Sequence, residues 1–345
     1  MCSAAVAAAA QSAPVDIAAL GIKKLAYEMP SYTFIKESAG EVVDGSGGPG
    51  SSSKMELTES RALENGSNIF VLDTQSPQRR LLVSGGSHPA WSPDGSQIAY
   101  CTWKALGFGQ IEVVNADGTG KRQITDMKGG ACFPDWSPDG AKIAFAALSV
   151  GDKEKNLIDA SNPEIFVVDK NGGTPVPVAP GYAPRWSRGG TMLIFLRGPE
   201  KKGPNASVWL ATADGQKSKV VATSDRRVAG VSWLPDGTGI AVSFGSGEKY
   251  AVYRMSLDGS GPQGNQPQKI AGDDMASFSQ PVLSPDMKHL IAMKSGRCAG
   301  SGESEAKCST FGIFFTDLDT RKDVVLAGGI NFSVIWDRKQ AINAP

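Results

Sequence analysis

The chain has 345 residues, of which 41% are hydrophobic, and its 35 Lys and Arg residues balance 35 Asp and Glu. This zero net charge gives no long-range attraction to nucleic acid or to an anionic membrane, and no apolar run is long enough for a transmembrane helix. The 41 glycines and 21 prolines indicate a chain with many turns.

Residues 1–20 form an Ala-rich segment, which we interpret as a tail or the remnant of a secretion signal. Its "AQSA" stretch is typical of the small-residue region before a signal cleavage site. Cys2 followed by Ser also matches the first residues of a mature bacterial lipoprotein, and the sequence leaves this alternative open. Residues 21–67 are predicted to be an N-terminal extension with a flexible Gly/Ser-rich segment.

From residue 68 onward one sequence motif recurs. "WSPDGSQIAY" begins at Trp91, and "WSPDGAKIAF" begins 45 residues later, at Trp136. The six copies begin at Trp91, Trp136, Trp186, Trp233, Leu283 and Trp336. A β-rich repeat of 40 to 50 residues predicts a propeller or an array of similar units.

Each copy predicts four short strands. The first strand ends at the Trp and is followed by S-P-D-G, a type I turn with Pro and Gly in their favoured places. A second strand such as "QIAY" follows, then a third such as "IEVVNA", a Gly-containing turn, and a fourth such as "KVVAT". Four antiparallel strands make one propeller blade.

Six copies therefore predict an all-β, six-bladed propeller over residues 68–345, whose last blade is closed by both termini. "NIFVLDT" and "RRLLVS" precede the first copy as a third and a fourth strand, and the segment after residue 331 supplies the missing beginning. In one version the C-terminus gives two strands. In the other, Lys23 to Met29 supplies the second strand, so that the C-terminus gives one strand and the N-terminus three. Either closure removes an open sheet edge.

These repeats resemble the TolB-like β-propellers, in which "WSPDG" motifs alternate with strands such as "IFVVD". The resemblance covers roughly residues 68–345 and implies a periplasmic binding scaffold with a protein partner. The sequence departs from the motif in the third copy, which has Arg188 and Gly189, and in the fifth, which has Leu283 and Met287. It also has only a short segment where TolB has an α/β domain before its propeller, so the TolB partner does not carry over directly.

Five cysteines are present. Cys298 and Cys308 flank the polar loop "AGSGESEAK", and we expect them to form a disulfide in an oxidising compartment. Cys101 and Cys132 lie within or beside the repeats and are interpreted as buried free thiols.

The sequence contains little that is typical of catalysis. It has two histidines and no G-x-S-x-G motif, so a Ser-His-Asp hydrolase is disfavoured. His289 is interpreted as a partly buried structural residue, whereas His88 precedes an innermost strand, where it could contact a ligand in the channel. We expect no cofactor. "DLDTRKD" at 317–323 has acidic spacing loosely like that of a calcium loop but lacks the central Gly and terminal Glu, so a structural calcium site there is the less favoured alternative.

Two sets of connections are expected on opposite faces. The S-P-D-G and D-G turns are short and repetitive, so we assign them a structural role. The loops on the other face differ from blade to blade, and functional residues are commonly carried by such loops. The binding-face candidates are His88, Trp103, Phe108, Tyr182, Arg226, Arg227, Asp274 and Phe278.

The sequence therefore favours a monomeric, non-catalytic, extracytoplasmic scaffold that binds a protein or a cell-envelope polymer. The alternative is a propeller enzyme, a polysaccharide lyase or a hydrolase, with its active site at the channel mouth. A third interpretation is a regulatory propeller that acts beside a separate catalytic chain.

Overall fold

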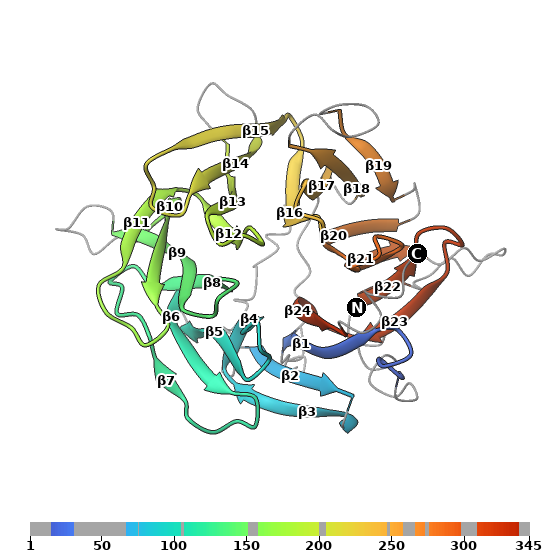
Figure 1. Cartoon of the computed structure of the whole chain (residues 1–345), viewed down its shortest axis with the longest axis horizontal. Coiled ribbons are helices and arrows are strands. Elements are labelled where there is room, and N and C mark those ends of the chain that lie inside the picture. Colours follow the sequence, from blue (N-terminus) through green and yellow to red (C-terminus); the bar gives the residue numbers. More distant parts are fainter. Residues whose placement is uncertain are drawn as a thin grey trace, which may run out of the picture.

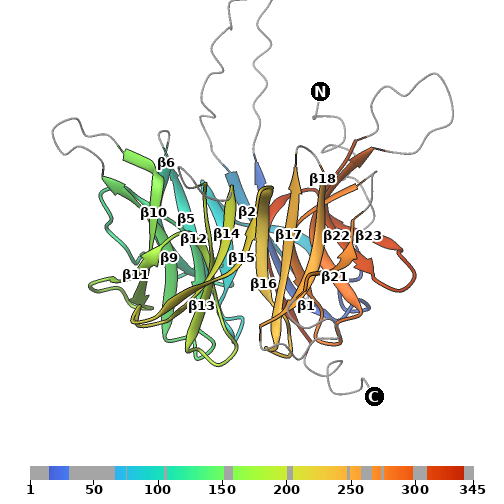
Figure 2. The ribbon, with the colours of Figure 1, turned by 90° about the horizontal axis from the view of Figure 1, so that it is seen from above.

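The computed structural model describes residues 15–30, 67–74, 76–104, 107–150, 158–199, 205–246, 249–257, 266–272, 276–297 and 309–337. Within these ranges six four-stranded antiparallel sheets form a ring around a central channel (Figure 1). The blades stand side by side and their strands run between the two faces of the disc (Figure 2). None of the described segments is a helix capable of crossing a membrane.

The first three blades are consecutive in sequence. Blade 1 contains β4 (Gly86–Trp91), β5 (Gln97–Lys104), β6 (Gly107–Asn115) and β7 (Arg122–Gln123). Blade 2 contains β8 (Ala131–Trp136), β9 (Lys142–Val150), β10 (Ile158–Asp169) and β11 (Val176–Pro180). Blade 3 contains β12 (Tyr182–Trp186), β13 (Met192–Arg197), β14 (Ala206–Thr212) and β15 (Ser218–Ser224).

The ring is completed by two further consecutive blades and one shared blade. Blade 4 contains β16 (Arg227–Trp233), β17 (Gly239–Ser246), β18 (Lys249–Ser256) and β19 (Gln268–Ala271). Blade 5 contains β20 (Ala276–Leu283), β21 (His289–Arg297), β22 (Ser309–Asp317) and β23 (Asp323–Ala327). Blade 6 contains β24 (Ile330–Trp336), β1 (Ile22–Pro30), β2 (Ser67–Asp73) and β3 (Ser76–Ser84).

Blade 6 confirms that both termini close the ring, and it selects the version with one C-terminal and three N-terminal strands. β24 pairs with β1, which pairs with β2, so residues 22–30 belong to the propeller and not to a separate extension. Ile17, which we had placed in the Ala-rich tail, is 3% exposed and packs against the cores of blades 5 and 6.

The last repeat copy does not begin at Trp336, as we had expected. In blade 1, Trp91 pairs with Ile98 of the second strand, and in blade 6 the matching partner, Leu25, pairs with Val334. Val334 therefore occupies the position that Trp91 has in its own blade. The correction arises because the second strand of this blade comes from the other end of the chain.

The S-P-D-G turns form as the sequence predicts. In the first copy the Gly95 N–H donates to Ser92 O at 2.8 Å, and Asp94 Oδ1 accepts from Ser92 Oγ at 2.6 Å. The hydrogen bond from the Ser92 hydroxyl, followed by the one from the Ser96 backbone N–H, lowers the pKa of Asp94 to about 2. Gly95 has φ of 70°, a left-handed conformation that strongly favours glycine. The Asp side chain therefore stabilises its own turn.

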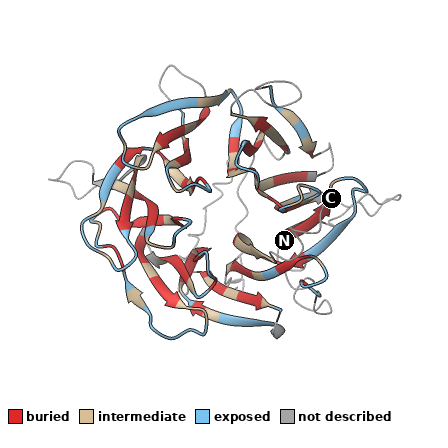
Figure 3. Ribbon diagram, viewed as in Figure 1, coloured by how far each residue is buried: buried red, intermediate tan, exposed pale blue. Residues whose placement is uncertain are grey.

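The repeated Trp residues hold neighbouring blades together. Trp136 is 6% exposed and its Nε1 donates to Ala90 O of blade 1 at 3.1 Å. Trp233 Nε1 makes the equivalent bond to Arg185 O of blade 3. Buried residues lie along the inner strands, whereas the outermost strands are largely exposed (Figure 3).

Candidate functional site

A cavity of about 200 Å³ lies in the central channel, beside the N-terminal halves of the innermost strands. Its wall is mostly apolar, with a few polar side chains, as is common for binding sites. Its lining includes His88, Phe133, Tyr182, Arg185, Gln280 and Asn331.

The backbone explains why these side chains reach the channel. Each innermost strand has a register shift three residues before its Trp-equivalent position, which marks a β-bulge. A bulge bends its strand and redirects a side chain. Five of the six blades have a non-glycine residue with φ between 41° and 58° at this position, and blade 4 has Gly230. The non-glycine residues are His88, Phe133, Ala183, Gln280 and Asn331.

A left-handed conformation costs a non-glycine residue about 1–3 kcal/mol, so such residues persist only where surrounding structure holds them. Here the repeat itself holds them, because every blade has the bulge. The backbone is thus nearly six-fold symmetric, while the side chains it presents to the channel differ in each blade. This combination gives an asymmetric recognition surface on a rigid ring.

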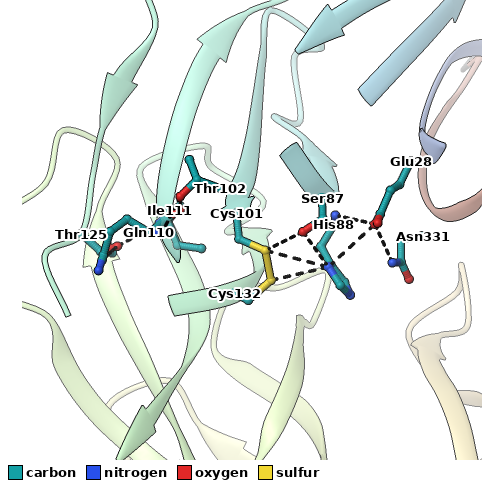
Figure 4. Close-up of a disulfide and its surroundings, with 10 residues drawn as sticks. All are labelled: Glu28, Ser87, His88, Cys101, Thr102, Gln110, Ile111, Thr125, Cys132 and Asn331. Atoms are coloured by element: carbon teal, nitrogen blue, oxygen red, sulfur yellow. Dashed lines mark hydrogen bonds and ion pairs between the residues drawn. A yellow bond between two sulfur atoms is a disulfide. The ribbon is translucent and has the colours of Figure 1, made fainter. Parts of the chain in front are cut away.

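His88 lines this cavity and lies between the side chains of Cys101 and Glu28 (Figure 4). Its backbone N–H donates to Glu28 Oε2 at 3.1 Å, and its ring packs edge-on against Phe133 at a centroid distance of 4.4 Å. Burial, followed by the positive charge of Arg185, lowers the pKa of His88 to about 4. The imidazole is therefore neutral at physiological pH.

A buried hydrogen-bond network extends from His88 into blades 5 and 6. Glu28 is 4% exposed, and its Oε2 accepts a second bond from Asn331 Nδ2 at 2.7 Å. Asn331 Oδ1 accepts in turn from Gln280 Nε2 at 2.5 Å. Two hydrogen-bond donors therefore hold the buried side chain of Glu28 in place.

On the other side of the cavity Arg185 pairs with Asp135. Arg185 Nη1 lies 3.2 Å from Asp135 Oδ1, and the backbone N–H of Trp186 donates to Asp135 Oδ2 at 2.8 Å. Burial raises the pKa of Asp135, an effect that Arg185 opposes. This pair joins blades 2 and 3 at the cavity wall.

Cys101 and Cys132 form a disulfide that joins β5 of blade 1 to β8 of blade 2 (Figure 4). Their interpretation as free thiols was therefore wrong. They are 31 residues apart in sequence, and only the packing of neighbouring blades brings them together. The predicted Cys298–Cys308 pair lies outside the described residues.

The predicted binding-face residues that the structure describes separate into four groups. His88 and Tyr182 line the cavity, and burial raises the pKa of Tyr182. Arg226 and Arg227 are exposed where the chain enters blade 4. The backbones of Trp103 and Phe108 are paired in the register of β5 and β6, and Asp274 lies outside the described residues.

Phe278 is the fourth case and a correction. It is 4% exposed and packs in the core of blade 5, because the alternation of β20 turns its side chain inward. His289, by contrast, is half-buried as expected, stacks on Phe315 and lies 3.5 Å from Asp286.

Sequence reasoning missed Phe133, Arg185, Gln280, Asn331 and Glu28 as members of the site. A signal existed for part of this set. Proline follows the left-handed residue in four blades, and a proline within a strand is typical of a bulge. Nothing local marked Glu28, which reaches the site from the far end of the chain.

Ser87, His88 and Glu28 do not form a hydrolytic triad. Ser87 Oγ and Glu28 Oε2 lie 3.3 Å and 3.9 Å from the same ring nitrogen of His88, Nδ1. A triad uses one imidazole nitrogen for the nucleophile and the other for the acidic residue. Ser87 is also 1% exposed, so a substrate could not reach its hydroxyl.

No protein-family model and no curated protein matches the chain. Among solved structures it is similar to TolB from Acinetobacter baumannii, with a TM-score of 0.57 and 19% identity over 78% of this chain and 62% of that one. The chain thus spans less than two thirds of that TolB. A TolB structure from Agrobacterium tumefaciens has a TM-score of 0.54 and 18% identity over 76% of this chain and 90% of that chain.

Hydrazine synthase from Kuenenia stuttgartiensis, an enzyme, is also similar, with a TM-score of 0.63 and 14% identity over 91% of this chain and 47% of that one. At these identities the comparisons establish the fold. The protein is a six-bladed β-propeller, and its fold is similar to that of these TolB structures.

Proposed function

We propose that this propeller is a non-catalytic, extracytoplasmic binding scaffold that receives a segment of a protein partner in its central cavity. The observation that carries the proposal is the cavity itself, in which six bulged strands present different side chains on a rigid ring. Aromatic and proline side chains supply apolar contact area, and the amides of Gln280 and Asn331 supply polar contacts. An apolar or aromatic side chain of the partner fits this wall better than an acidic one.

The charges around the cavity support binding over catalysis. Glu28 is held by two donors, Asp135 is paired with Arg185, and the imidazole of His88 is neutral. General acid–base catalysis needs a group that is free to exchange a proton with substrate. Glu28 and Asp135 instead form their hydrogen bonds with other residues of the protein.

Two features support the location and the partner. The interblade disulfide is typical of proteins in an oxidising compartment. The similarity to the TolB fold supports a protein partner. The chain covers 62% of the Acinetobacter protein, and the capture experiment identifies the partner.

The test begins with capture of partners from a cell-envelope extract on immobilised protein, followed by affinity measurement with each purified partner. Tyr182→Ala removes an aromatic wall of the cavity, and Arg227→Ala removes an exposed charge near it. If these residues are anchors, each change weakens binding about 5- to 30-fold, or ~1–2 kcal/mol. Arg188→Ala, in the third S-P-D-G-type turn, is the matched control and leaves the affinity unchanged.

Equal effects of Tyr182→Ala and Arg188→Ala would contradict the assignment of the face. Turnover of any member of a polysaccharide and peptide panel by the wild-type protein would contradict the non-catalytic function. Melting temperatures of all variants show whether a loss of binding reflects a loss of fold.

A further inference from the structure

Three soft ligand atoms converge beside the cavity. Cys101 Sγ, Cys132 Sγ and His88 Nδ1 lie within 4.8 Å of one another, and they form the one such group of three found in the described part of the chain. The nitrogen lies 3.5 Å from Cys132 Sγ and 3.9 Å from Cys101 Sγ. Neither the hydrogen-bond network nor the proposed binding function gives these three atoms a joint role.

We propose that in the dithiol state Cys101, Cys132 and His88 bind one thiophilic d¹⁰ cation, with Zn²⁺ as the probe ion, and that the disulfide closes this site. Two thiolates and one imidazole are ligands that Zn²⁺ prefers. The same pair of cysteines then serves as an interblade cross-link when oxidised and as metal ligands when reduced.

The distances fit a tetrahedral ion. Bonds of about 2.3 Å to sulfur and 2.05 Å to nitrogen at a tetrahedral angle place nitrogen and sulfur about 3.6 Å apart. The two nitrogen–sulfur distances in the structure are 3.5 Å and 3.9 Å. Reduction lets the sulfurs separate to the ~3.8 Å that the same geometry requires between them. The imidazole can therefore bind the ion in nearly its present place.

Neighbouring groups hold the ligands in position. Ser87 Oγ lies 2.9 Å from Cys101 Sγ, where its hydroxyl can donate to a thiolate. The Phe133 ring packs edge-on against the imidazole, and Glu28 Oε2 accepts the backbone N–H of His88. Such contacts around a metal site orient the ligands and tune their affinity.

The redox step requires a dithiol reductant. Reduction breaks the sulfur–sulfur bond with two electrons and two protons, giving two thiols, while the reductant becomes a disulfide. On binding Zn²⁺, each thiol releases its proton to solvent. Both cysteines are 1% exposed, so a small dithiol is the suitable reductant in vitro.

The experiment uses the full chain with Cys2, Cys298 and Cys308 replaced by Ser, so that the two proposed ligands are the remaining cysteines. The protein is reduced with a dithiol, freed of reductant without oxygen, and titrated with Zn²⁺ against a chromogenic chelator. Co²⁺ serves as a spectroscopic substitute, because thiolate ligation gives a charge-transfer band. We expect one equivalent of Zn²⁺ in the reduced protein and none in the reoxidised protein.

His88→Ala is expected to weaken Zn²⁺ binding about tenfold or more, whereas the matched control His289→Ala leaves it unchanged. The proposal is overturned if the reduced protein binds no stoichiometric Zn²⁺, if the disulfide form binds equally well, or if His88→Ala has no effect. Circular dichroism covers the case in which reduction unfolds the chain. Zn²⁺ must then restore the β-sheet signal, and failure to do so also overturns the proposal.

Discussion

Two repeated tryptophans that look equivalent in sequence differ in one hydrogen bond, and this predicts unequal losses of stability on the same substitution. Trp136 is 6% exposed and its Nε1 donates to Ala90 O at 3.1 Å. Trp186 is 8% exposed, yet its buried Nε1 meets no acceptor among the described residues. Replacing either residue by Phe removes the same volume and the same N–H donor.

The difference between the two variants follows from these contacts. Trp136→Phe loses a hydrogen bond of ~1 kcal/mol, whereas Trp186→Phe removes a buried unsatisfied donor that costs about 1–3 kcal/mol. The cavity left by the smaller ring is common to both and cancels in the comparison. Trp136→Phe should therefore be less stable than Trp186→Phe by about 2–4 kcal/mol.

Thermal unfolding monitored by calorimetry measures this difference. For 345 residues the unfolding entropy is about 0.7 kcal/mol/K, so the predicted gap is about 3–6 °C in Tm. The two variants are compared at the same protein concentration and pH. Melting temperatures that agree within about 1 °C, or a Trp186→Phe variant that is the less stable one, would refute the reasoning.

Three further outcomes are expected. Deleting residues 331–345 removes nearly all of β24 and leaves β1 as an open edge, so calorimetry should show a lower, broader transition and light scattering more aggregation; an unchanged transition contradicts the shared blade. Met287 has φ of 57° at a position where other copies have Gly, so Met287→Gly should raise the free energy of unfolding by ~1 kcal/mol. Gly237 has φ of 77° and open space around it, so Gly237→Ala should lower the free energy of unfolding by a similar amount. Arg185→Met removes the charge that opposes the raised pKa of Asp135. A carboxyl group with a raised pKa favours its neutral form in the folded state, so stability is lost as pH rises through that pKa. Denaturant titrations should therefore show that the substitution is more destabilising at pH 7 than at pH 4. Equal destabilisation at the two pH values, or a pH effect that survives with Asp135→Asn added, would contradict that mechanism.

The sequence by itself determined the repeating unit, because the interactions that form it are local. The turn at Ser92 to Gly95 is held by hydrogen bonds between residues two to five positions apart, and its Gly supplies the left-handed backbone. Strand alternation and the spacing of the Trp residues then predict four strands per blade and six blades. None of this depends on which segments meet across the ring.

Tertiary structure alone decided the features that depend on closure. Val334, and not Trp336, matches the other anchors because its partner strand is β1, some 300 residues away in sequence. Phe278 is buried because side chains alternate between the two faces of β20, although the sequence around it resembled an exposed loop.

The site itself is the clearest case. Glu28, His88 and Asn331 come from three distant segments, and Cys101 meets Cys132 across a blade boundary. Their contacts exist because a closed ring brings the bulged N-terminal halves of all six innermost strands around one channel. Local sequence encodes each bulge, but which side chains face one another is decided by the order and closure of the blades.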